Sequence, residues 1–325
     1  MSVKLRAAVV VPCFNASETI AATVASVQAQ TISDWELVVV DDGSTDGSPD
    51  IVEAIAAADQ RVTLVRQENA GVSSARNAGF AATSAPVIGL IDSDDLWKPH
   101  FLETMLGAFE DPEVGAAFSR AEILDAQGIS TGVTTNFSDT ATELDSLIMT
   151  NPAGTCSTLV LRRETIDDVG PFATELLRVE DQHWILKARL GGWSLQGVDD
   201  VLVGYRTSGE GLSADLEGML EGWEAMIELL DGQIDEERVR EARAEHFFYL
   251  ARRSLRLGRS PLTTMRYLKD AFATDSRVPC RKLLRLPVAV VRRFRHEQSL
   301  RGVGNASLHD FGVHSPDSEK LEDAA

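Results

Sequence analysis

AAVVVPCFN at residues 7–15 and ELVVVDDGS at residues 36–44 decide the fold. Each stretch is a run of apolar, largely β-branched residues that ends in polar, turn-forming ones. A strand without polar alternation is buried on both faces, as in a parallel sheet that helices cover on both sides. Further apolar runs at 62–65 and 86–91, with helical spacing between the runs, continue this alternation to about residue 110. The sequence therefore predicts an α/β fold with a mostly parallel central sheet.

The composition is that of a globular protein. The 325 residues are 44% hydrophobic and 25% charged, and a net charge of -19 argues against nucleic acid as a partner. The cysteines Cys13, Cys156 and Cys280 are too far apart in sequence for a disulfide framework or the paired spacing of a zinc site. No run reaches the ~18 apolar residues of a membrane-spanning helix. We therefore expect a cytoplasmic protein that is neither secreted nor transmembrane.

Carboxylates follow two of the predicted strands. Asp41 and Asp42 end one strand, and Asp92 and Asp94 end another. Ligands of open parallel sheets bind beyond the carboxyl ends of the strands, so these acids are expected to share one edge. The alternation in Asp92-Ser93-Asp94 aims two carboxylates to similar sides, which suits Mg²⁺ or Mn²⁺. The alternative is that they cap a helix near Pro99 and are solvated.

Arg76 stands in a glycine- and serine-rich turn, NAGVSSARNAG at residues 69–79, which opens a helix after a strand. The positive end of that helix and the guanidinium together could hold a phosphate. An arginine in the first turns of a helix can equally be a solvated or salt-bridged surface group.

Four motifs occur in order: VVVPCFNASETI (9–20), ELVVVDDGSTDGS (36–48), ENAGVSSARNAG (68–79) and IDSDDLWKP (91–99). In their residues, order and spacing these motifs resemble the inverting glycosyltransferases of family 2, and the resemblance covers residues 7 to about 213. The resemblance implies a GT-A fold, a Rossmann-like nucleotide-binding sheet merged with an acceptor-binding part. It also implies transfer of a sugar from a nucleotide donor.

The resemblance further implies a set of nucleotide-contacting residues: Pro12, Phe14, Asn15, Glu18, Asp42, Arg76, Asp92 and Ser93. By this resemblance Phe14 would stack on the base and Asp42 would accept a hydrogen bond from a pyrimidine. Arg76 would approach the nucleotide, Asp92 would face the ribose or donor sugar, and Asp94 would ligate the metal.

The resemblance also supplies a catalytic base. Gly170-Pro171-Phe172 and the later Glu180-Asp181 pair look like the family's Gly-x-Phe stretch and Glu-Asp pair, which makes Asp181 the expected base. Glu180-Asp181 also reads as an ordinary helix start. One departure is that relatives often have a histidine shortly after Tyr-Arg, whereas this chain reads Tyr205-Arg206-Thr207-Ser208. The Gln-x-x-Arg-Trp signature of processive relatives is absent too, which favours addition of a single sugar.

The chain divides into four expected parts. Residues 1–213 form the GT-A catalytic domain, with a nucleotide-sugar half to about 110 and an acceptor half over about 111–213. Residues 214–276 form a helical extension with helices over 219–230, 236–257 and 262–273. Residues 277–301 carry eight Lys or Arg against one acid, among apolar residues, and could lie on an anionic membrane or simply pack. Residues 302–325 are acidic and expected to be disordered.

The sequence therefore predicts a metal-dependent inverting glycosyltransferase, with Mg²⁺ or Mn²⁺ as cofactor. The expected donor is a UDP-hexose or UDP-N-acetylhexosamine, and the expected acceptor is a glycan or lipid-linked hydroxyl in surface polysaccharide assembly. Peripheral contact with the inner face of the membrane is open. Two alternatives are a noncatalytic sugar-nucleotide-binding scaffold and a phosphohydrolase with Asp92 as nucleophile.

Overall fold

Strand β1 (Ala7–Cys13) is buried along its whole length and shows how the sheet is covered. In the computed structural model, which describes residues 6–137, 142–207, 215–230, 232–281 and 308–311, successive β1 side chains enter different cores. Val9 and Val11 pack in a core on one face, and Ala8 and Val10 pack in a core on the other. The uninterrupted apolar run is thus explained by burial from both sides, as predicted.

Within the described residues the central sheet has nine strands in the order β3-β2-β1-β4-β8-β6-β9-β5, with β7 paired to β6. The strands are β1, β2 (Trp35–Asp41), β3 (Val62–Arg66), β4 (Val87–Leu90), β5 (Leu96–Trp97), β6 (Val114–Leu124), β7 (Ser130–Thr134), β8 (Leu159–Arg162) and β9 (Ser194–Arg206). Strands β3, β2, β1 and β4 are mutually parallel, and so are β6 and β9. Strand β8 runs antiparallel to β4 and β6 and joins these two parallel parts. The α/β expectation is confirmed, and strands β5, β7 and β8 add antiparallel pairings to the sheet.

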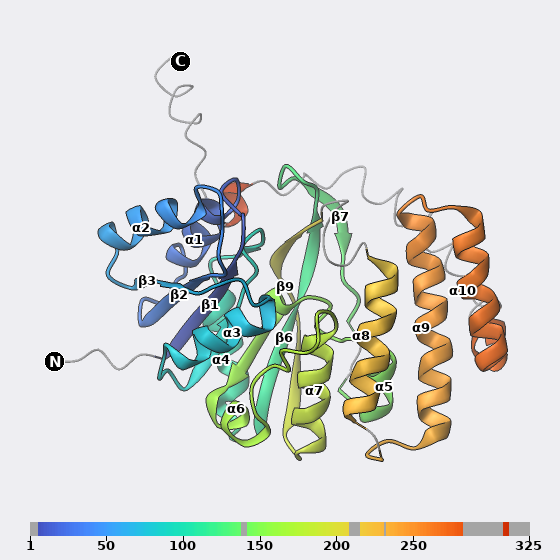
Figure 1. Ribbon diagram of the computed structural model, residues 1–325. Coiled ribbons are helices and arrows are strands. Elements are labelled where there is room, and N and C mark those ends of the chain that lie inside the picture. The colour runs from blue at the N-terminus through green and yellow to red at the C-terminus, as the bar shows by residue number, and fades with distance from the viewer. Residues whose placement is uncertain (1–5, 138–141, 208–214, 231, 282–307, 312–325) are drawn as a thin grey trace.

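Helices cover both faces of the sheet (Figure 1). The cover of one face consists of α1 (Ile20–Gln28), α2 (Ser48–Ala58) and α4 (Phe101–Gly107). The other face carries α3 (Val72–Ala81), α5 (Leu144–Met149), α6 (Arg163–Val169) and α7 (Glu180–Leu190). Short 3-10 turns follow at Ala108–Glu110 and Cys156–Thr158. The predicted alternation of strand and helix over the first 110 or so residues is therefore confirmed.

Helix α3 lies unusually close to β1 because of Gly79. A Cβ atom built at Gly79 would lie 2.3 Å from Val10 Cγ1, far inside a normal contact. Ala75 and Ala78, also small, pack the same helix against β2. The small residues of the NAGVSSARNAG stretch thus press α3, and with it Arg76, onto the sheet.

Helices α8 (Leu216–Leu229), α9 (Glu236–Arg256) and α10 (Pro261–Thr274) follow the sheet and extend the molecule to one side (Figure 1). Trp223 and Met226 of α8 join the core that also contains Trp184 of α7. The predicted helices are confirmed to within three residues at every end. Among the described residues no helix is long and apolar enough to cross a membrane.

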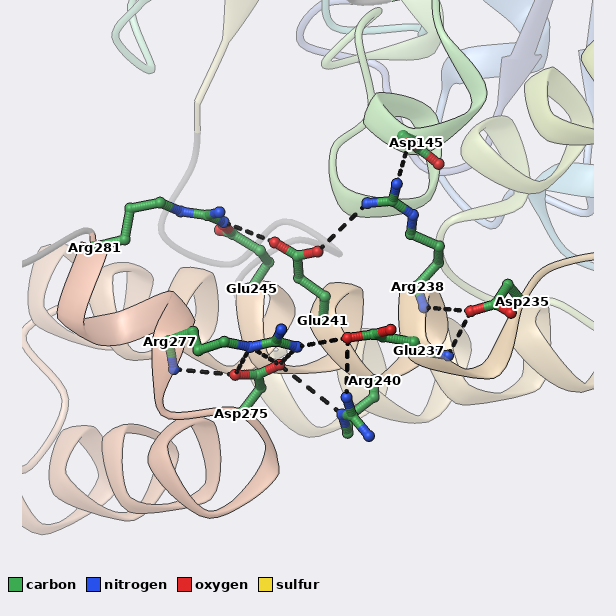
Figure 2. A network of polar contacts seen from close by, with 10 residues as sticks. All are labelled: Asp145, Asp235, Glu237, Arg238, Arg240, Glu241, Glu245, Asp275, Arg277 and Arg281. Carbon is green, nitrogen blue, oxygen red and sulfur yellow. Dashed lines mark hydrogen bonds and ion pairs between the residues drawn. The ribbon is translucent and has the colours of Figure 1, made fainter.

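The start of the basic segment turns toward α9 (Figure 2). Arg277 pairs with Asp275 at 2.6 Å and with Glu237 at 3.2 Å, and Arg281 pairs with Glu241 and Glu245 at 3.0 and 3.1 Å. In the same network Arg238 links α9 to Asp145 of α5. The first two arginines of the segment therefore hold protein carboxylates. Residues 282–301 lie outside the described residues, so the membrane expectation for them stays a prediction.

A short 3-10 turn, Leu308–Phe311, lies within the predicted tail. Phe311 is fully buried, against Leu96 of β5 and Leu124 of β6. This differs from the disorder expected over 302–325, because an aromatic side chain finds an apolar pocket on the sheet. Residues 302–307 and 312–325 lie outside the described residues.

Candidate active site at the carboxyl edge of the sheet

The loops after β1 and β2 are tied together by hydrogen bonds. The Asn15 N–H donates to Ser44 Oγ at 2.9 Å, and the Thr45 N–H donates to Asn15 Oδ1 at 2.8 Å. Asn15 has φ of 50°, a left-handed conformation that asparagine tolerates better than most residues. Beside it the Phe14 side chain is half exposed, and Pro12 is buried at the end of β1. The aromatic ring is therefore available for stacking, as the resemblance implies.

Asp42 is almost fully buried, and its carboxylate is held by three donors from the segment before α3. Oδ1 accepts from Gln67 Nε2 at 2.7 Å and from the Ala70 N–H at 2.9 Å. Oδ2 accepts from the Gly71 N–H at 2.9 Å, and Gly71 needs its φ of +89° to present that N–H. A carboxylate has about four acceptor positions, so Oδ2 retains capacity for a ligand.

Arg76 joins the two acidic motifs. Its Nη2 lies 2.7 Å from Asp92 Oδ1 and its Nη1 lies 2.6 Å from Glu180 Oε1, with the arginine side chain only 3% exposed. A buried ion pair needs such partners, because a lone buried charge is strongly unfavourable. The expected direct contact between Arg76 and the nucleotide stays a prediction. What the structure adds is that this arginine holds Asp92 and Glu180 side by side.

Asn77, the next residue of α3, fixes the loop that leads to α7. Its Nδ2 donates to the Phe172 carbonyl at 2.9 Å, and the Phe172 N–H donates back to its Oδ1 at 3.0 Å. The Phe172 ring lies 5.7 Å from the Arg76 guanidinium carbon. The Arg-Asn pair of one motif therefore docks the Gly-Pro-Phe stretch of another.

Asp181 sits at the start of α7 with its carboxylate held on both oxygens. Asn151 Nδ2 donates to Oδ2 at 2.6 Å, and the Gln182 N–H donates to Oδ1 at 2.8 Å. Burial and the negative charge of Glu180 raise the pKa of Asp181 to about 6. The preceding residue, Val179, has φ of 57°, a strained conformation for a β-branched side chain. Such strain is common where function fixes a geometry.

Three of these acids lie close enough to Cys156 to act electrostatically on its thiol. The thiol is buried, and burial raises its pKa while the charge of Arg76 opposes that rise. The charges of Asp181, Glu180 and Asp92 act on the same thiol in the raising direction. Residues from three distant parts of the chain therefore converge on the same region.

The turn between β4 and β5 carries Asp92, Asp94 and Asp95. Burial and the charge of Asp92 raise the pKa of Asp94 to about 6. Asp95 is completely buried, accepts hydrogen bonds from the Ser157 hydroxyl and the Arg206 N–H, and has a raised pKa through burial first. Arg206 also donates from Nε to the Asp94 carbonyl at 2.8 Å. These acids therefore repel each other in a partly desolvated turn.

The donor chemistry of this turn fits a divalent cation bound mainly by a ligand. Among the described residues no three His, Cys, Asp or Glu side chains gather as a metal site. Asp94, however, is a partly exposed carboxylate whose charge is disfavoured by Asp92. A hard cation taking Asp94, diphosphate oxygens and water would relieve that repulsion. Ser208, which stands where relatives often have a histidine, lies outside the described residues.

Several contributors were not expected from the sequence. Glu180, Asn151 and Ser157 hold the predicted site residues Arg76, Asp181 and Asp92 respectively. Arg206 and Asp95 form a second layer behind Asp94. Sequence patterns gave a signal for only two of these residues: the Glu-Asp pair contains Glu180, and the Asp-x-Asp-Asp run contains Asp95. The other contacts join residues that are far apart in sequence.

The structure places two other predicted site residues, but their contacts do not indicate a role. Glu18 is exposed just before α1, and Ser93 is half-buried between Asp92 and Asp94, with its carbonyl accepting from the Thr23 hydroxyl. Their contacts with a nucleotide stay predictions.

Comparison with known proteins finds glycosyltransferases among the relatives of this chain. The chain is 32% identical over 174 residues to an uncharacterized glycosyltransferase, alr2836, of Nostoc, covering 52% of this chain and 54% of that protein. It is 27% identical over 209 residues to the UDP-Glc:alpha-D-GlcNAc-diphosphoundecaprenol beta-1,3-glucosyltransferase WfgD of Escherichia coli, covering 64% and 79%. The matched stretches span 54%, 64% and 59% of the first three curated relatives.

Two solved structures share the fold. One is S. aureus TarS 1-349 in complex with UDP-GlcNAc, with a TM-score of 0.61 and 19% identity, covering 84% of this chain and 83% of that one. The other is the mannosyltransferase PcManGT from Pyrobaculum calidifontis in complex with GDP-Man and Mn²⁺, with a TM-score of 0.60 and 19% identity, covering 98% and 88%. The model of glycosyl transferase family 2 matches residues 8–170. The chain belongs to glycosyl transferase family 2.

Proposed function

We propose that this chain transfers a single hexose or N-acetylhexosamine, with inversion, from a nucleotide donor to a hydroxyl of a glycan or lipid-linked acceptor. The observation that carries the proposal is Arg76, which holds Asp92 at 2.7 Å and Glu180 at 2.6 Å. Asp92 belongs to the turn expected at the donor, and Glu180 precedes the expected base. One buried guanidinium therefore ties the donor side of the reaction to the acceptor side.

Asp181 is the proposed general base. In an inverting transfer the acceptor oxygen attacks the anomeric carbon as the bond to the diphosphate breaks, and the acceptor proton passes to a carboxylate. A pKa of about 6 keeps Asp181 mostly ionised at neutral pH and makes it a stronger base than an ordinary aspartate. Asn151 and the Gln182 N–H fix its orientation. The proton thus moves from the acceptor hydroxyl to an Asp181 oxygen.

The donor is proposed to lie across the carboxyl ends of β1, β2 and β4. Phe14 would stack on the base, and Asp42 would accept from it with the free capacity of Oδ2. Asp94 would hold Mg²⁺ or Mn²⁺, which when bound would offset the charge that develops on the leaving diphosphate. Asp95 and Arg206 orient the Asp94 turn from behind.

Surface polysaccharide assembly is the proposed setting. The printed name of WfgD describes transfer from UDP-Glc to a lipid-diphosphate acceptor, and TarS was solved with UDP-GlcNAc. A UDP-sugar and a lipid-linked acceptor are therefore our first choices. Residues 1–213 would form the catalytic domain and residues 214–276 an extension beside it.

A peripheral membrane contact is proposed on one observation. Leu262, Met265 and Phe272 of α10 are exposed and, with Lys269, lie along the stripe opposite the buried Thr264, Tyr267 and Ala271. An exposed apolar stripe with a cation at its centre suits the headgroup region of an anionic membrane. Since Arg277 and Arg281 face α9, this stripe and residues 282–301 would make the contact.

The membrane contact is tested by sedimentation with phosphatidylcholine vesicles, with and without phosphatidylglycerol. Serine at all three apolar positions should reduce sedimentation with the anionic vesicles. Serine at Ile129 and Val133, apolar residues that are also exposed and lie beside and within β7, is the control and should change nothing. Equal sedimentation of both variants would contradict the contact.

The proposed reaction is tested with a panel of nucleotide sugars, with Mg²⁺ or Mn²⁺, by measuring nucleoside diphosphate release with and without candidate acceptors. We expect release from a UDP-sugar that EDTA abolishes. Asp94→Ala should weaken metal-dependent UDP binding, whereas Asp199→Asn, an exposed acid of β9, should not. Binding of nucleotides without any turnover across the panel would instead indicate a noncatalytic binder.

A further inference from the structure

The Phe311 ring occupies a shaped pocket on the far side of the acidic turn. It is fully buried against Leu96 of β5, Leu124 of β6 and Ala22 of α1. Gly204 of β9 forms the floor, since a Cβ built there would lie 2.7 Å from Phe311 Cζ and 2.7 Å from Leu124 Cδ1. Lys98 Nζ lies 5.9 Å from the ring centroid and 3.3 Å from Glu122. The pocket thus admits an aromatic ring only because residue 204 lacks a side chain.

This pocket lies directly behind the predicted metal-binding turn. Leu96 follows Asp95 in sequence and pairs with Gly204 across β5 and β9. Two residues beyond Gly204, the Arg206 N–H donates to Asp95 Oδ1 at 2.8 Å and Arg206 Nε donates to the Asp94 carbonyl at 2.8 Å. Strand β5 has only two residues, so few ladder hydrogen bonds hold it to β9. Side-chain packing beneath Leu96 and Gly204 must supply the rest of the stabilisation that holds β5 to β9.

We infer that Phe311 is a positioning residue: it clamps β5 to β9 and so holds Asp94 and Arg206 in place for the donor diphosphate. The inference rests on the proposed function for its ligand, though not for its geometry. It assigns the C-terminal turn, more than a hundred residues beyond Arg206 in sequence, to the donor site. Phe311 itself touches no reacting atom and acts through Leu96 and Gly204.

The first test is backbone hydrogen exchange in the full chain. Phe311→Ala should speed exchange of the Lys98 N–H, which donates to the Leu202 carbonyl, and of the Arg206 N–H, by about tenfold or more. Phe311→Leu, which refills most of the pocket, should restore slow exchange. Phe248→Ala, which removes another buried ring, from α9, is the matched control and should leave these two amides unchanged.

The second test is function. Phe311→Ala should weaken Mn²⁺-dependent binding of UDP and lower kcat/KM for the donor about tenfold, because small displacements of positioning groups are costly. The KM for the acceptor should stay constant, since Asp181 and Asn151 lie on other elements. Phe248→Ala should lower the melting temperature without this selective loss.

A double-mutant cycle sharpens the assignment. Gly204→Ala should displace the ring and reproduce the donor defect of Phe311→Ala. In the Phe311→Ala background the same substitution should cost less, because no ring remains for the new methyl group to strike. Additive effects would show that the two residues act separately.

The outcomes are separable. If wild-type protein turns over no nucleotide sugar, the proposed function fails, while hydrogen exchange still decides the role of Phe311. If Phe311→Ala matches wild type at both amides, or if Phe248→Ala disturbs them equally, the inference is overturned.

Discussion

Carboxylates and arginines meet in two regions of this molecule with opposite electrostatic results. At the sheet edge, Asp94 and Asp181 have pKa values raised to about 6 by burial and by neighbouring acids. In the helical extension, hydrogen bonds from Arg277 lower the pKa of Asp275 to about 2 (Figure 2). The same residue types are therefore satisfied in one region and in conflict in the other.

The difference separates structure from function. In the extension, Glu237, Asp275 and Glu241 each lie beside an arginine whose side chain is about half exposed, and such pairs add little and disturb nothing. The sheet edge gathers Asp92, Asp94, Asp95, Glu180 and Asp181 around two arginines, Arg76 and Arg206, and leaves the excess repulsion in place. A fold tolerates such an arrangement where a ligand or a proton completes it. Equivalent substitutions in these two regions should therefore have different effects on stability and activity.

The largest effect is expected from Arg76→Ala. It leaves Asp92 and Glu180 facing each other without their shared cation, which should cost about 3 kcal/mol or more of unfolding free energy. Arg243→Ala is the matched control, because Arg243 makes a bidentate pair with Glu224 but is one third exposed. It should cost at most about 1 kcal/mol. Urea titrations of both variants measure these losses. Equal losses of unfolding free energy would contradict the difference between the two regions.

A smaller effect of opposite sign is expected from Asp181→Asn. An acid whose pKa is raised in the folded state favours the protonated form, so its ionised form opposes folding above pH 6. A neutral amide removes that opposition, but its NH2 group would face one of the two donors that hold the carboxylate, Asn151 Nδ2 or the Gln182 N–H. We therefore expect a net stabilisation of only about 1 kcal/mol at pH 7.5, less than the pKa shift alone would give. Asp275→Asn should lower the melting temperature instead, since that acid is stabilised by Arg277. Thermal unfolding of the two variants in one buffer decides it.

The smallest effect is expected from a change of pH, which should affect the sheet edge before the helical extension. Below about pH 6 Asp94 and Asp181 take up protons, so kcat/KM should fall about tenfold per pH unit or more. Asp275, with a lowered pKa, contributes stability that is fully present above its unfolded value of 3.8 and is lost as pH falls toward about 2. At pH 5 circular dichroism should therefore show a folded helical extension in an enzyme whose kcat/KM is reduced about tenfold or more. Unchanged kcat/KM at pH 5 would contradict the assignment of both acids.

Much of the fold was predictable because its signals are local. The unbroken apolar runs of β1 and β2 require burial on both faces, and the helical spacing between the runs indicates the helices that cover them. The antiparallel insertion of β8 between β4 and β6 was not foreseen, since strand order depends on contacts between residues far apart in sequence.

The residues of the site were predictable, but the contacts among them were not. The motifs named Asp42, Asp92, Asp94 and Asp181, and the structure brings the last three near one another. No pattern showed that Arg76 spans Asp92 and Glu180, because an arginine in the first turns of a helix reads as a surface group. Phe311 was hidden for a similar reason: a single aromatic in an acidic tail carries no signal of the pocket that receives it.

The central claim is that the acids of the sheet edge act on one nucleotide sugar, with Asp181 as the base. Single-turnover sugar transfer by Asp181→Asn, with UDP affinity measured on the same sample, tests it most directly. We expect transfer to fall by at least ~100-fold while UDP affinity stays within about twofold of wild type. Transfer at the wild-type rate would contradict the claim.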